Sequence, residues 1–316
     1  MRRLVLCCFK PGSISYYACV PPEVPQRLAD GGFDFRYVET PEQFLDDLPQ
    51  AEIAIAAVFR KEWLTQAPRL KWVASYAAGR ERIPERELRE AGIQVTFGRF
   101  HGRIMAETVL GMMLFTARGL GTAYRLQKTV QWCDTVLHGR VWTLRDQTCL
   151  IMGLGHIGQH VARLTKALGM YNIGIKRVAG GTYPDVDRVV ALEDFRTVLP
   201  QADHLVLILP HVAATDRLIG RAELELMKPG AALYNVGRGN CLDETALYQA
   251  LREQKIAWAA LDVFEAEPLP MESPLRELDN ILILPHSSAF ASEYYGLFFR
   301  EFLEDWEAYR KNAPEE

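Results

Sequence analysis

Three polar residues in the second half of the chain have the side chains that acid–base chemistry on a carboxylic acid would use. Arg238, Glu267 and His286 each come just after a short apolar run. An imidazolium can donate a proton to an oxygen that gains negative charge, a carboxylate can orient the imidazole, and a guanidinium can bind a carboxylate. Any one of them alone is more often part of a surface ion pair. They indicate chemistry only if the fold brings them to one place.

A glycine-rich turn follows the predicted strand 148–152 and opens the predicted helix 159–168. In this setting Gly153 permits a tight turn, Gly155 lets a pyrophosphate approach the backbone, and Gly158 packs the helix against the strand. The helix N-terminus offers N–H groups and a positive dipole end. A turn without a ligand is the alternative, but the order of strand, turn and helix favours a dinucleotide site. Its predicted contacts are Gly153, Gly155, His156, Ile157 and Gly158.

The end of the next predicted strand indicates which dinucleotide binds. A carboxylate there would accept hydrogen bonds from a ribose 2′-hydroxyl, but this chain has Lys176 and Arg177 instead. Two cations can bind a 2′-phosphate, so the sequence favours NADP over NAD, with NAD still possible. A solvated basic loop is the alternative reading of the pair.

The elements that must position these residues are short apolar runs that alternate with helical patterns, an order typical of parallel sheets with helices on both faces. We predict two α/β domains in tandem, so that Arg238, Glu267 and His286 follow carboxyl ends of strands in one sheet. The apolar segment 104–118 predicts a helix buried on every face between the domains. Aromatic residues four apart from Tyr294 to Trp306 predict a C-terminal helix packed in a core. Predicted strands are 4–9, 33–38, 53–58, 72–75 and 93–96, then 148–152, 173–175, 204–209, 231–236, 257–261 and 281–284.

Composition excludes several classes of protein. The chain has 316 residues, 49% of them hydrophobic, and a net charge of -4, which is typical of a globular protein and gives no sign of nucleic-acid binding. No apolar run reaches the roughly 20 residues that span a bilayer. The run 4–9 is too short for a signal peptide, so we expect a cytoplasmic protein. Six cysteines without a C-x-x-C pair predict reduced, mostly buried thiols and no metal site.

The segment from Gly139 to Ala289 resembles the D-isomer-specific 2-hydroxyacid dehydrogenases, and within them the glyoxylate/hydroxypyruvate reductases. The resemblance implies two Rossmann-like domains with parallel sheets. The cofactor domain, 98–288, would be inserted into a discontinuous substrate domain, 1–97 with 289–316. It also implies a homodimer through the long interdomain helix.

The resemblance assigns roles to single residues. Arg238 would bind the substrate carboxylate, His286 would donate the proton, and Glu267 would accept a hydrogen bond from the other ring nitrogen of His286. Asp262 would accept a hydrogen bond from the nicotinamide carboxamide. The remaining implied cofactor contacts are Leu209, Pro210, His211, Thr215, Val236, Gly237, His286 and Ser288.

The same resemblance places a substrate-binding loop at Tyr76 to Gly79, where the N–H groups of Ala78 and Gly79 would hold the carboxylate. The family pattern G-x-G-x-D reads Ala77-Ala78-Gly79-Arg80-Glu81 here, so this loop departs from it. Arg60, or its neighbour Phe59, would reach the substrate side chain. Trp132 would cap the pocket from a partner subunit.

The sequence therefore predicts a reductase that transfers a hydride from NADPH to a small 2-keto acid such as glyoxylate or hydroxypyruvate, giving glycolate or D-glycerate. A bulkier 2-keto acid is the first alternative. Formate dehydrogenation is disfavoured, because that relative has glutamine where Glu267 stands. A dinucleotide-sensing protein without turnover, like the corepressors built on this fold, is the alternative from another class.

Overall fold

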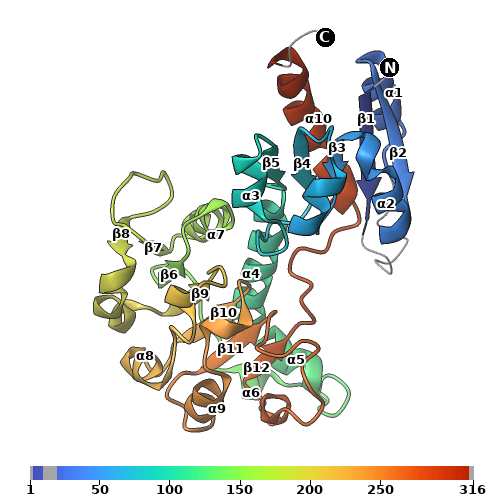
Figure 1. The fold of residues 1–316 in the computed structure, drawn as a ribbon. Coiled ribbons are helices and arrows are strands. Elements are labelled where there is room, and N and C mark those ends of the chain that lie inside the picture. The colour runs from blue at the N-terminus through green and yellow to red at the C-terminus, as the bar shows by residue number, and fades with distance from the viewer. Residues whose placement is uncertain (1–2, 10–19, 313–316) are drawn as a thin grey trace. The chain divides into compact units, whose positions relative to one another are not determined.

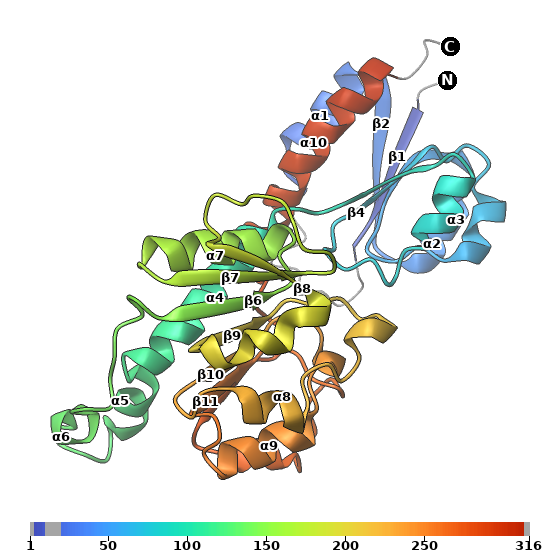
Figure 2. The same cartoon turned by 90° about the vertical axis from the view of Figure 1, so that its left-hand side faces the viewer.

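The computed structural model describes residues 3–9 and 20–312 and shows two parallel β-sheets, each with helices on its faces (Figures 1 and 2). The predicted fold class is confirmed. Unit 1 comprises Met1–His101 and Phe290–Glu316, and unit 2 comprises Gly102–Ala289. Unit 1 is therefore discontinuous in sequence.

Unit 1 contains a five-stranded sheet in the order β2-β1-β3-β4-β5, with every neighbouring pair parallel. Each of the five strands predicted in this part of the chain is present, although the one predicted at 53–58 ends earlier, at Ile55. The strands are β1 (Arg3–Cys8), β2 (Phe33–Val38), β3 (Ala51–Ile55), β4 (Trp72–Ser75) and β5 (Gln94–Phe97). The helices are α1 (Glu23–Asp30), α2 (Pro41–Asp47), α3 (Glu85–Glu90) and α10 (Tyr294–Asn312).

The C-terminal helix α10 packs on this sheet through its aromatic stripe. Phe302 stacks on Trp72 with ring centroids 5.1 Å apart, and Trp306 meets Phe33 edge-on at 5.7 Å. Phe298, Phe302 and Trp306 are almost fully buried. The prediction that this stripe packs in a core is confirmed.

The opposite face of the unit 1 sheet is covered by α2 and α3. Alternate residues of a strand point to opposite faces, and Leu4 and Leu6 of β1 lie in one core cluster with Phe44 of α2 and Leu88 of α3. Covering both faces explains why every residue of the central strands β3 and β4 is buried.

Unit 2 contains a seven-stranded parallel sheet in the order β12-β11-β10-β9-β6-β7-β8. The edge strand β8 was not predicted, because four residues after a long polar stretch give too short an apolar pattern. The strands are β6 (Thr148–Met152), β7 (Tyr171–Lys176), β8 (Arg188–Ala191), β9 (His204–Leu207), β10 (Ala232–Asn235), β11 (Trp258–Leu261) and β12 (Ile281–Ile283). The helices are α4 (His101–Ala117, whose first residue falls in unit 1), α5 (Leu120–Leu126), α6 (Asp134–Leu137), α7 (His156–Ala167), α8 (Arg221–Leu226) and α9 (Glu244–Arg252).

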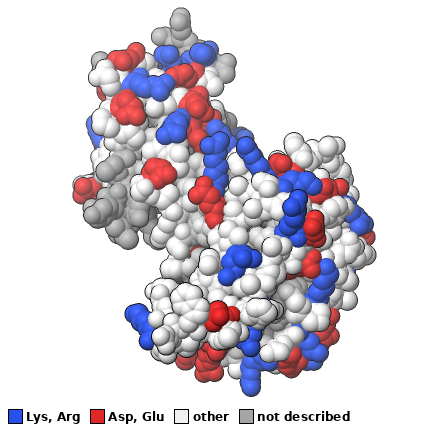
Figure 3. Space-filling view, turned by 180° about the vertical axis from the view of Figure 1, so that it is seen from behind, with Lys and Arg blue, Asp and Glu red and all other residues white. Residues whose placement is uncertain are grey.

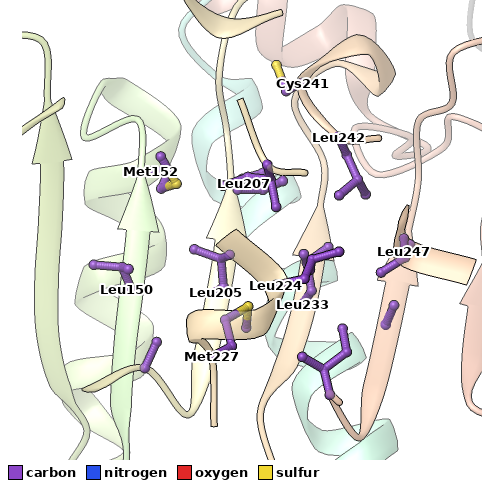
Figure 4. Close-up of a cluster of buried hydrophobic side chains, with 14 of the residues drawn as sticks. Leu150, Met152, Leu205, Leu207, Leu224, Met227, Leu233, Cys241, Leu242 and Leu247 are labelled. Atoms are coloured by element: carbon purple, nitrogen blue, oxygen red, sulfur yellow. The ribbon is translucent and has the colours of Figure 1, made fainter. Parts of the chain in front are cut away.

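Two apolar clusters fill the two sides of the unit 2 sheet. Leu150 and Leu205 lie in one cluster with Leu224 of α8 and with Met227, the residue after that helix, and Leu247 of α9 belongs to the same cluster (Figure 4). The alternate strand residues face a second cluster formed with α4 and α7. This alternation fixes the register of every strand and with it the place where each strand ends.

Helix α4 is not buried on every face, contrary to the sequence prediction. Met105, Val109 and Met113 are buried, whereas Glu107 and Gly111 are exposed. The apolar composition misled the prediction, because Leu110 and Leu114 are apolar but only half-buried in unit 2.

Charges of both signs are interspersed on the face shown in Figure 3. Among the described residues no single helix is long and apolar enough to cross a membrane, and α4 with α5 passes that test only as a pair bent by 65°. No group of three potential metal ligands occurs in the described chain. Of the cysteines, Cys7, Cys149 and Cys241 are buried and Cys8 and Cys133 half-buried, all as free thiols, while Cys19 lies outside the described residues.

Candidate active site

The carboxyl edge of the unit 2 sheet collects the residues that the sequence singled out. Because all strands are parallel, the loops after β6, β7, β9, β10, β11 and β12 lie at one edge. The chain order reverses between β6 and β9, and such a switch point is where open parallel sheets bind ligands. The loops approach closely there, since a Cβ at Gly153 would overlap the carbonyl oxygen of Ile208.

His286 and Glu267 form a hydrogen-bonded pair at this edge. The Nδ1 atom of His286 lies 2.7 Å from Oε2 of Glu267, and the other carboxylate oxygen accepts the N–H of Phe264 at 3.0 Å. The His286 side chain is 56% exposed, and no hydrogen bond of its Nε2 is recorded within the described chain. The pair thus presents one ring nitrogen to solvent and fixes the other.

The loop that carries His286 is held by Asp262, at the end of β11. One carboxylate oxygen accepts the N–H of Ser287 at 2.6 Å and the other that of Ser288 at 2.9 Å, while the Asp262 carbonyl accepts the N–H of His286. From α4, the Thr108 hydroxyl donates to the Ser288 carbonyl at 3.0 Å. His286 is held at φ 52°, a strained conformation for a residue other than glycine. A strained backbone conformation persists only where the surrounding structure holds it, and the hydrogen bonds from Asp262 and Thr108 do so here.

Arg238 follows β10 in a turn held by Asn235. The buried Asn235 amide donates to the Arg238 carbonyl at 3.0 Å and accepts the N–H of Gly237 at 3.1 Å. The guanidinium donates to the Gly237 carbonyl at 2.8 Å and is half-buried. The sequence analysis gave Asn235 no role, and its position two residues before a glycine turn is the signal for one.

The glycine-rich turn has the geometry of an anion-binding helix start. A Cβ at Gly158 would overlap the carbonyl oxygen of Gly153, so α7 packs directly on the turn. Gly155 is the N-cap of α7 and no side chain caps the helix there. A Cβ on Gly155 would meet no protein atom within 4 Å. Packing within the protein therefore explains Gly158, whereas Gly155 leaves open space next to uncapped N–H groups.

Lys176 and Arg177 differ in their surroundings. Lys176 is half-buried. Its ammonium group contacts the Tyr183 hydroxyl and lies 4.8 Å from the centre of the Tyr183 ring. Arg177 is exposed. Tyr183, in the loop that leads to β8, was missed by the sequence analysis because no motif marks it.

The sequence pattern of the NAD-binding domain of D-isomer specific 2-hydroxyacid dehydrogenases matches residues 110–288, more than half of the chain. The chain belongs to this family. All the carboxyl-edge residues described above lie within the matched segment.

Three curated members of the family show how the similarity extends. D-3-phosphoglycerate dehydrogenase of Methanocaldococcus jannaschii is 34% identical over 258 residues, which cover 80% of this chain and 49% of that protein. The chain thus spans about half the length of that relative. Glyoxylate reductase of Thermococcus litoralis is 35% identical over 74% of this chain and 72% of that protein. Glyoxylate/hydroxypyruvate reductase B of Yersinia pestis is 30% identical over 89% of each.

Two solved structures share the fold over almost the whole chain. An acyclic imino acid reductase in complex with NADPH and D-Arg has a TM-score of 0.82 at 25% identity and covers 98% of each chain. The NADPH-dependent glyoxylate/hydroxypyruvate reductase of Sinorhizobium meliloti, in complex with NADP and malonate, has a TM-score of 0.74 at 25% identity and covers 99% of this chain and 95% of that chain.

Within this member of the family, the predicted cofactor contacts divide by exposure. The exposed contacts are Gly155, His156, Arg177, Pro210, His211 and His286, and the half-buried ones are Gly153, Ile157 and Lys176. Thr215 is 4% exposed and its hydroxyl donates to the Pro210 carbonyl at 2.6 Å, closing the turn after β9. The remaining predicted contacts are buried and pack beneath the loops of this sheet edge: Gly158, Leu209, Val236, Gly237, Asp262 and Ser288. That they contact a dinucleotide stays a prediction.

In unit 1, the loop after β4 carries the predicted substrate contacts. Ala78 is exposed and Gly79 half-buried, and no hydrogen bond of either N–H group is recorded within the described residues. The loop is held one residue earlier, where the Tyr294 hydroxyl donates to the Tyr76 carbonyl at 3.1 Å and contacts Nε2 of His101 at 2.8 Å. The sequence analysis assigned Tyr294 to core packing alone and gave His101 no role.

Of the two candidates for the substrate side chain, only Arg60 is exposed. Phe59 is 1% exposed and packs edge-on against Trp63, with centroids 5.5 Å apart. It therefore belongs to the core of unit 1, and the alternative that placed it at the substrate is wrong.

Proposed function

We propose that this protein reduces a small 2-keto acid with NADPH, giving the 2-hydroxy acid. The observation that carries the proposal is the His286–Glu267 pair at 2.7 Å, at the same sheet edge as Arg238. Keto-acid reduction needs a proton donor beside an anion-binding cation, and these side chains supply both. A dinucleotide sensor would need neither.

Each residue has a defined task in the proposed reaction. NADPH, when bound at the glycine-rich turn, would supply the hydride for the 2-carbon of the acid. Arg238 binds the substrate carboxylate and offsets charge that develops on the carbonyl oxygen. His286 donates a proton from Nε2 to that oxygen, while Glu267 holds the ring through its bond to Nδ1. The exposed imidazole then regains a proton from solvent.

The glycine-rich turn fits the dinucleotide. Open space at Gly155 next to the uncapped start of α7 accommodates a pyrophosphate, and the N–H groups there would bind its oxygens. We propose that Lys176 and Arg177 bind the 2′-phosphate of NADP, with Tyr183 orienting the lysine. NADPH bound in the imino acid reductase of the same fold supports this preference.

For unit 1 we propose a role in substrate binding, and for unit 2 a role in cofactor binding. The Ala78 and Gly79 N–H groups are available to a carboxylate in the loop after β4. Arg60 is available to a substrate side chain. The departures from the family pattern at Ala77 and Glu81 lie in this loop, so they bear on substrate choice.

Glyoxylate or hydroxypyruvate is the substrate that we propose. The names of the Thermococcus and Yersinia relatives support it. The phosphoglycerate dehydrogenase and imino acid reductase names favour two alternatives, a phosphorylated hydroxy acid and an imino acid, which the same assay distinguishes.

The test is the initial rate of NADPH and NADH oxidation with glyoxylate, hydroxypyruvate, a branched and an aromatic 2-keto acid, each with and without ammonium, and the reverse assay with phosphoglycerate. We expect turnover with the small keto acids, faster with NADPH, and no need for ammonium. Arg238→Ala should lose most of the rate, while the exposed Arg252→Ala at the end of α9 serves as the control for loss of a cation. NADPH binding without turnover of any acid would instead indicate a sensor.

We also propose a homodimer. Leu120, Tyr124 and Trp132 are 53%, 72% and 78% exposed in and after α5, and Leu110 and Leu114 of α4 are half-buried. Exposed apolar residues close together in sequence are typical of a protein interface. Light scattering of the protein and of Trp132→Glu measures the oligomeric state.

A further inference from the structure

The turn that presents Glu267 depends on backbone groups of its own residues. Phe264 N–H donates to one oxygen of the Glu267 carboxylate at 3.0 Å, and the other oxygen bonds His286 at 2.7 Å. The direction of this carboxylate is therefore set by the position of the backbone at residues 264 and 265. Any shift of that backbone moves the imidazole with it.

Glu244, the first residue of α9, binds the next N–H group of this turn. Its Oε1 accepts the N–H of Glu265 at 2.6 Å. Two successive N–H groups of the turn are thus bound by two carboxylates, one from within the turn and one from α9. The Glu265 side chain adds a third link, because it pairs with Arg217 at 3.3 Å.

The turn also lies against the loop that carries Arg238. A Cβ on Gly239 would overlap the backbone of Phe264 and Glu265. Arg217, the partner of Glu265, donates its own N–H to the Asn240 carbonyl at 2.7 Å. The loop of Arg238 and the turn of Glu267 therefore form one connected structure, and Glu244 belongs to it.

Helix capping does not account for Glu244. The N-cap of α9 is Asp243, whose side chain accepts the N–H of Ala246 at 2.9 Å. Partial burial raises the pKa of Glu244 and the nearby carboxylates of Glu265, Asp243 and Glu267 add to this rise, while the hydrogen bond from the Glu265 N–H acts in the opposite direction. A carboxyl group placed where its charge is disfavoured, at a helix that already has a cap, calls for another task.

We propose that Glu244 is a positioning residue: by binding the Glu265 N–H it fixes the turn 264–267 and so holds Glu267 against His286. This inference rests on the proposed function for its kinetic consequences. It concerns a residue outside the set Arg238, Glu267 and His286, and it acts on the reaction only through Glu267.

The test compares three variants with a control. Glu244→Gln keeps an oxygen that can accept the Glu265 N–H, Glu244→Ala removes it, and Glu244→Asp keeps the charge but shortens the reach. We expect kcat to fall about tenfold or more in the alanine and aspartate variants and to stay near the wild-type value in the glutamine variant, with the KM for NADPH unchanged. Glu253→Ala, which removes an exposed glutamate at the other end of α9, should change nothing.

Two kinetic results would overturn the proposal. One is an alanine variant whose kcat stays within about twofold of the wild-type value. The other is a glutamine variant as slow as the alanine variant, because the effect would then come from the charge rather than the hydrogen bond. If the alanine variant fails to fold, the kcat of the aspartate variant compared with that of the glutamine variant tests the same hydrogen bond.

A spectroscopic measurement decides the point independently of turnover. The ring proton resonances of His286, assigned by their loss in His286→Ala, are compared with those of Glu267→Gln, in which the pair is disrupted. In Glu244→Ala they should move toward the Glu267→Gln positions, and in Glu244→Gln they should not. If the wild-type protein shows no turnover, the proposed reaction is refuted, but the comparison of resonances still tests Glu244. If the resonances are unchanged in Glu244→Ala, the positioning role is refuted.

Discussion

The two sheets end in loops that are held in different ways. In unit 2 the loops are fixed by buried side chains of the sheet itself, such as Asp262, which binds two successive N–H groups, and Asn235, which spans its own turn. In unit 1 the loop after β4 is held by hydroxyl groups that each bind one backbone group of the loop. Ser75 accepts the N–H of Ala77 at 3.2 Å, and Tyr294 from α10 donates to the Tyr76 carbonyl at 3.1 Å.

This difference separates two demands on an enzyme. Proton transfer requires groups held to within a fraction of an ångström, and buried, fully bonded polar side chains provide that. Substrate choice can vary among relatives, and loops carry more sequence variation than the strands they connect. The pattern of the NAD-binding domain matches 110–288. The loop Ala77 to Glu81 lies outside that match, and its sequence differs from the G-x-G-x-D that the resemblance implies.

The largest effect should come from removing the proton donor of unit 2. We expect His286→Ala to lower kcat by about 10²–10⁴-fold, the usual contribution of a general acid. The melting temperature should change little, because the side chain is 56% exposed. Steady-state kinetics at saturating NADPH measure the loss.

The matched control for this variant is His138→Ala, which removes an exposed histidine from the end of α6. It should keep the wild-type rate. An active His286→Ala protein would show that the rigid edge of unit 2 does not carry the chemistry, and the contrast between the two units would lose its functional meaning.

The sequence predicted the fold well because each signal was local. Apolar runs bounded by polar turns located eleven strands, and the glycine-rich turn identified the start of α7. Strand β8 was missed because four residues at a sheet edge carry too little pattern. The burial of α4 was overestimated, since composition does not show which apolar face remains uncovered.

The site was predicted only in part, because its support is non-local. Arg238, Glu267 and His286 follow strands, so topology alone places them at one edge. The bonds from Asp262 to Ser287, from Glu244 to Glu265 and from Tyr294 to Tyr76 join distant parts of the chain. No spacing in the sequence reveals them.

A smaller effect should appear in the stability of unit 2 as the pH falls. His204, at the start of β9, lies at the sheet edge opposite the site, between the Tyr234 hydroxyl at 3.0 Å and the Gln147 amide oxygen at 2.8 Å. Burial lowers the pKa of His204 to about 4, although the Asp203 carboxylate acts in the opposite direction. The folded protein therefore excludes a proton that the unfolded chain binds below about pH 6.5.

The direction in which stability changes with pH follows from this difference in proton binding. The contribution of His204 is complete above about pH 6.5 and is lost as the pH falls toward 4, to a total of about 3 kcal/mol of unfolding free energy. Denaturant titrations at pH 7, 6 and 5 measure this loss of unfolding free energy. These pH values lie above the range where carboxyl groups with lowered pKa values, such as Glu223, begin to protonate. His204→Asn should show a flatter dependence over this interval, and an identical slope in both proteins would rule the cause out.

The smallest effect tests the loop of unit 1. Burial raises the pKa of Tyr294, so its hydroxyl stays protonated and can donate to the Tyr76 carbonyl. Tyr294→Phe removes this donor, a loss of about 1 kcal/mol that corresponds to roughly fivefold. If the loop binds the substrate carboxylate, the KM for the keto acid should rise by about that factor while the KM for NADPH stays constant, because no unit 2 contact has changed.

Tyr309→Phe is the matched control, since its hydroxyl lies on the same helix but bonds Glu52 at 2.6 Å, at the other end of the strands. Both variants should lose a similar amount of stability, and only Tyr294→Phe should affect the keto acid. Equal KM values in the two variants would mean that the loop after β4 does not depend on α10 for its shape, and the contrast between the two edges would have to be drawn elsewhere.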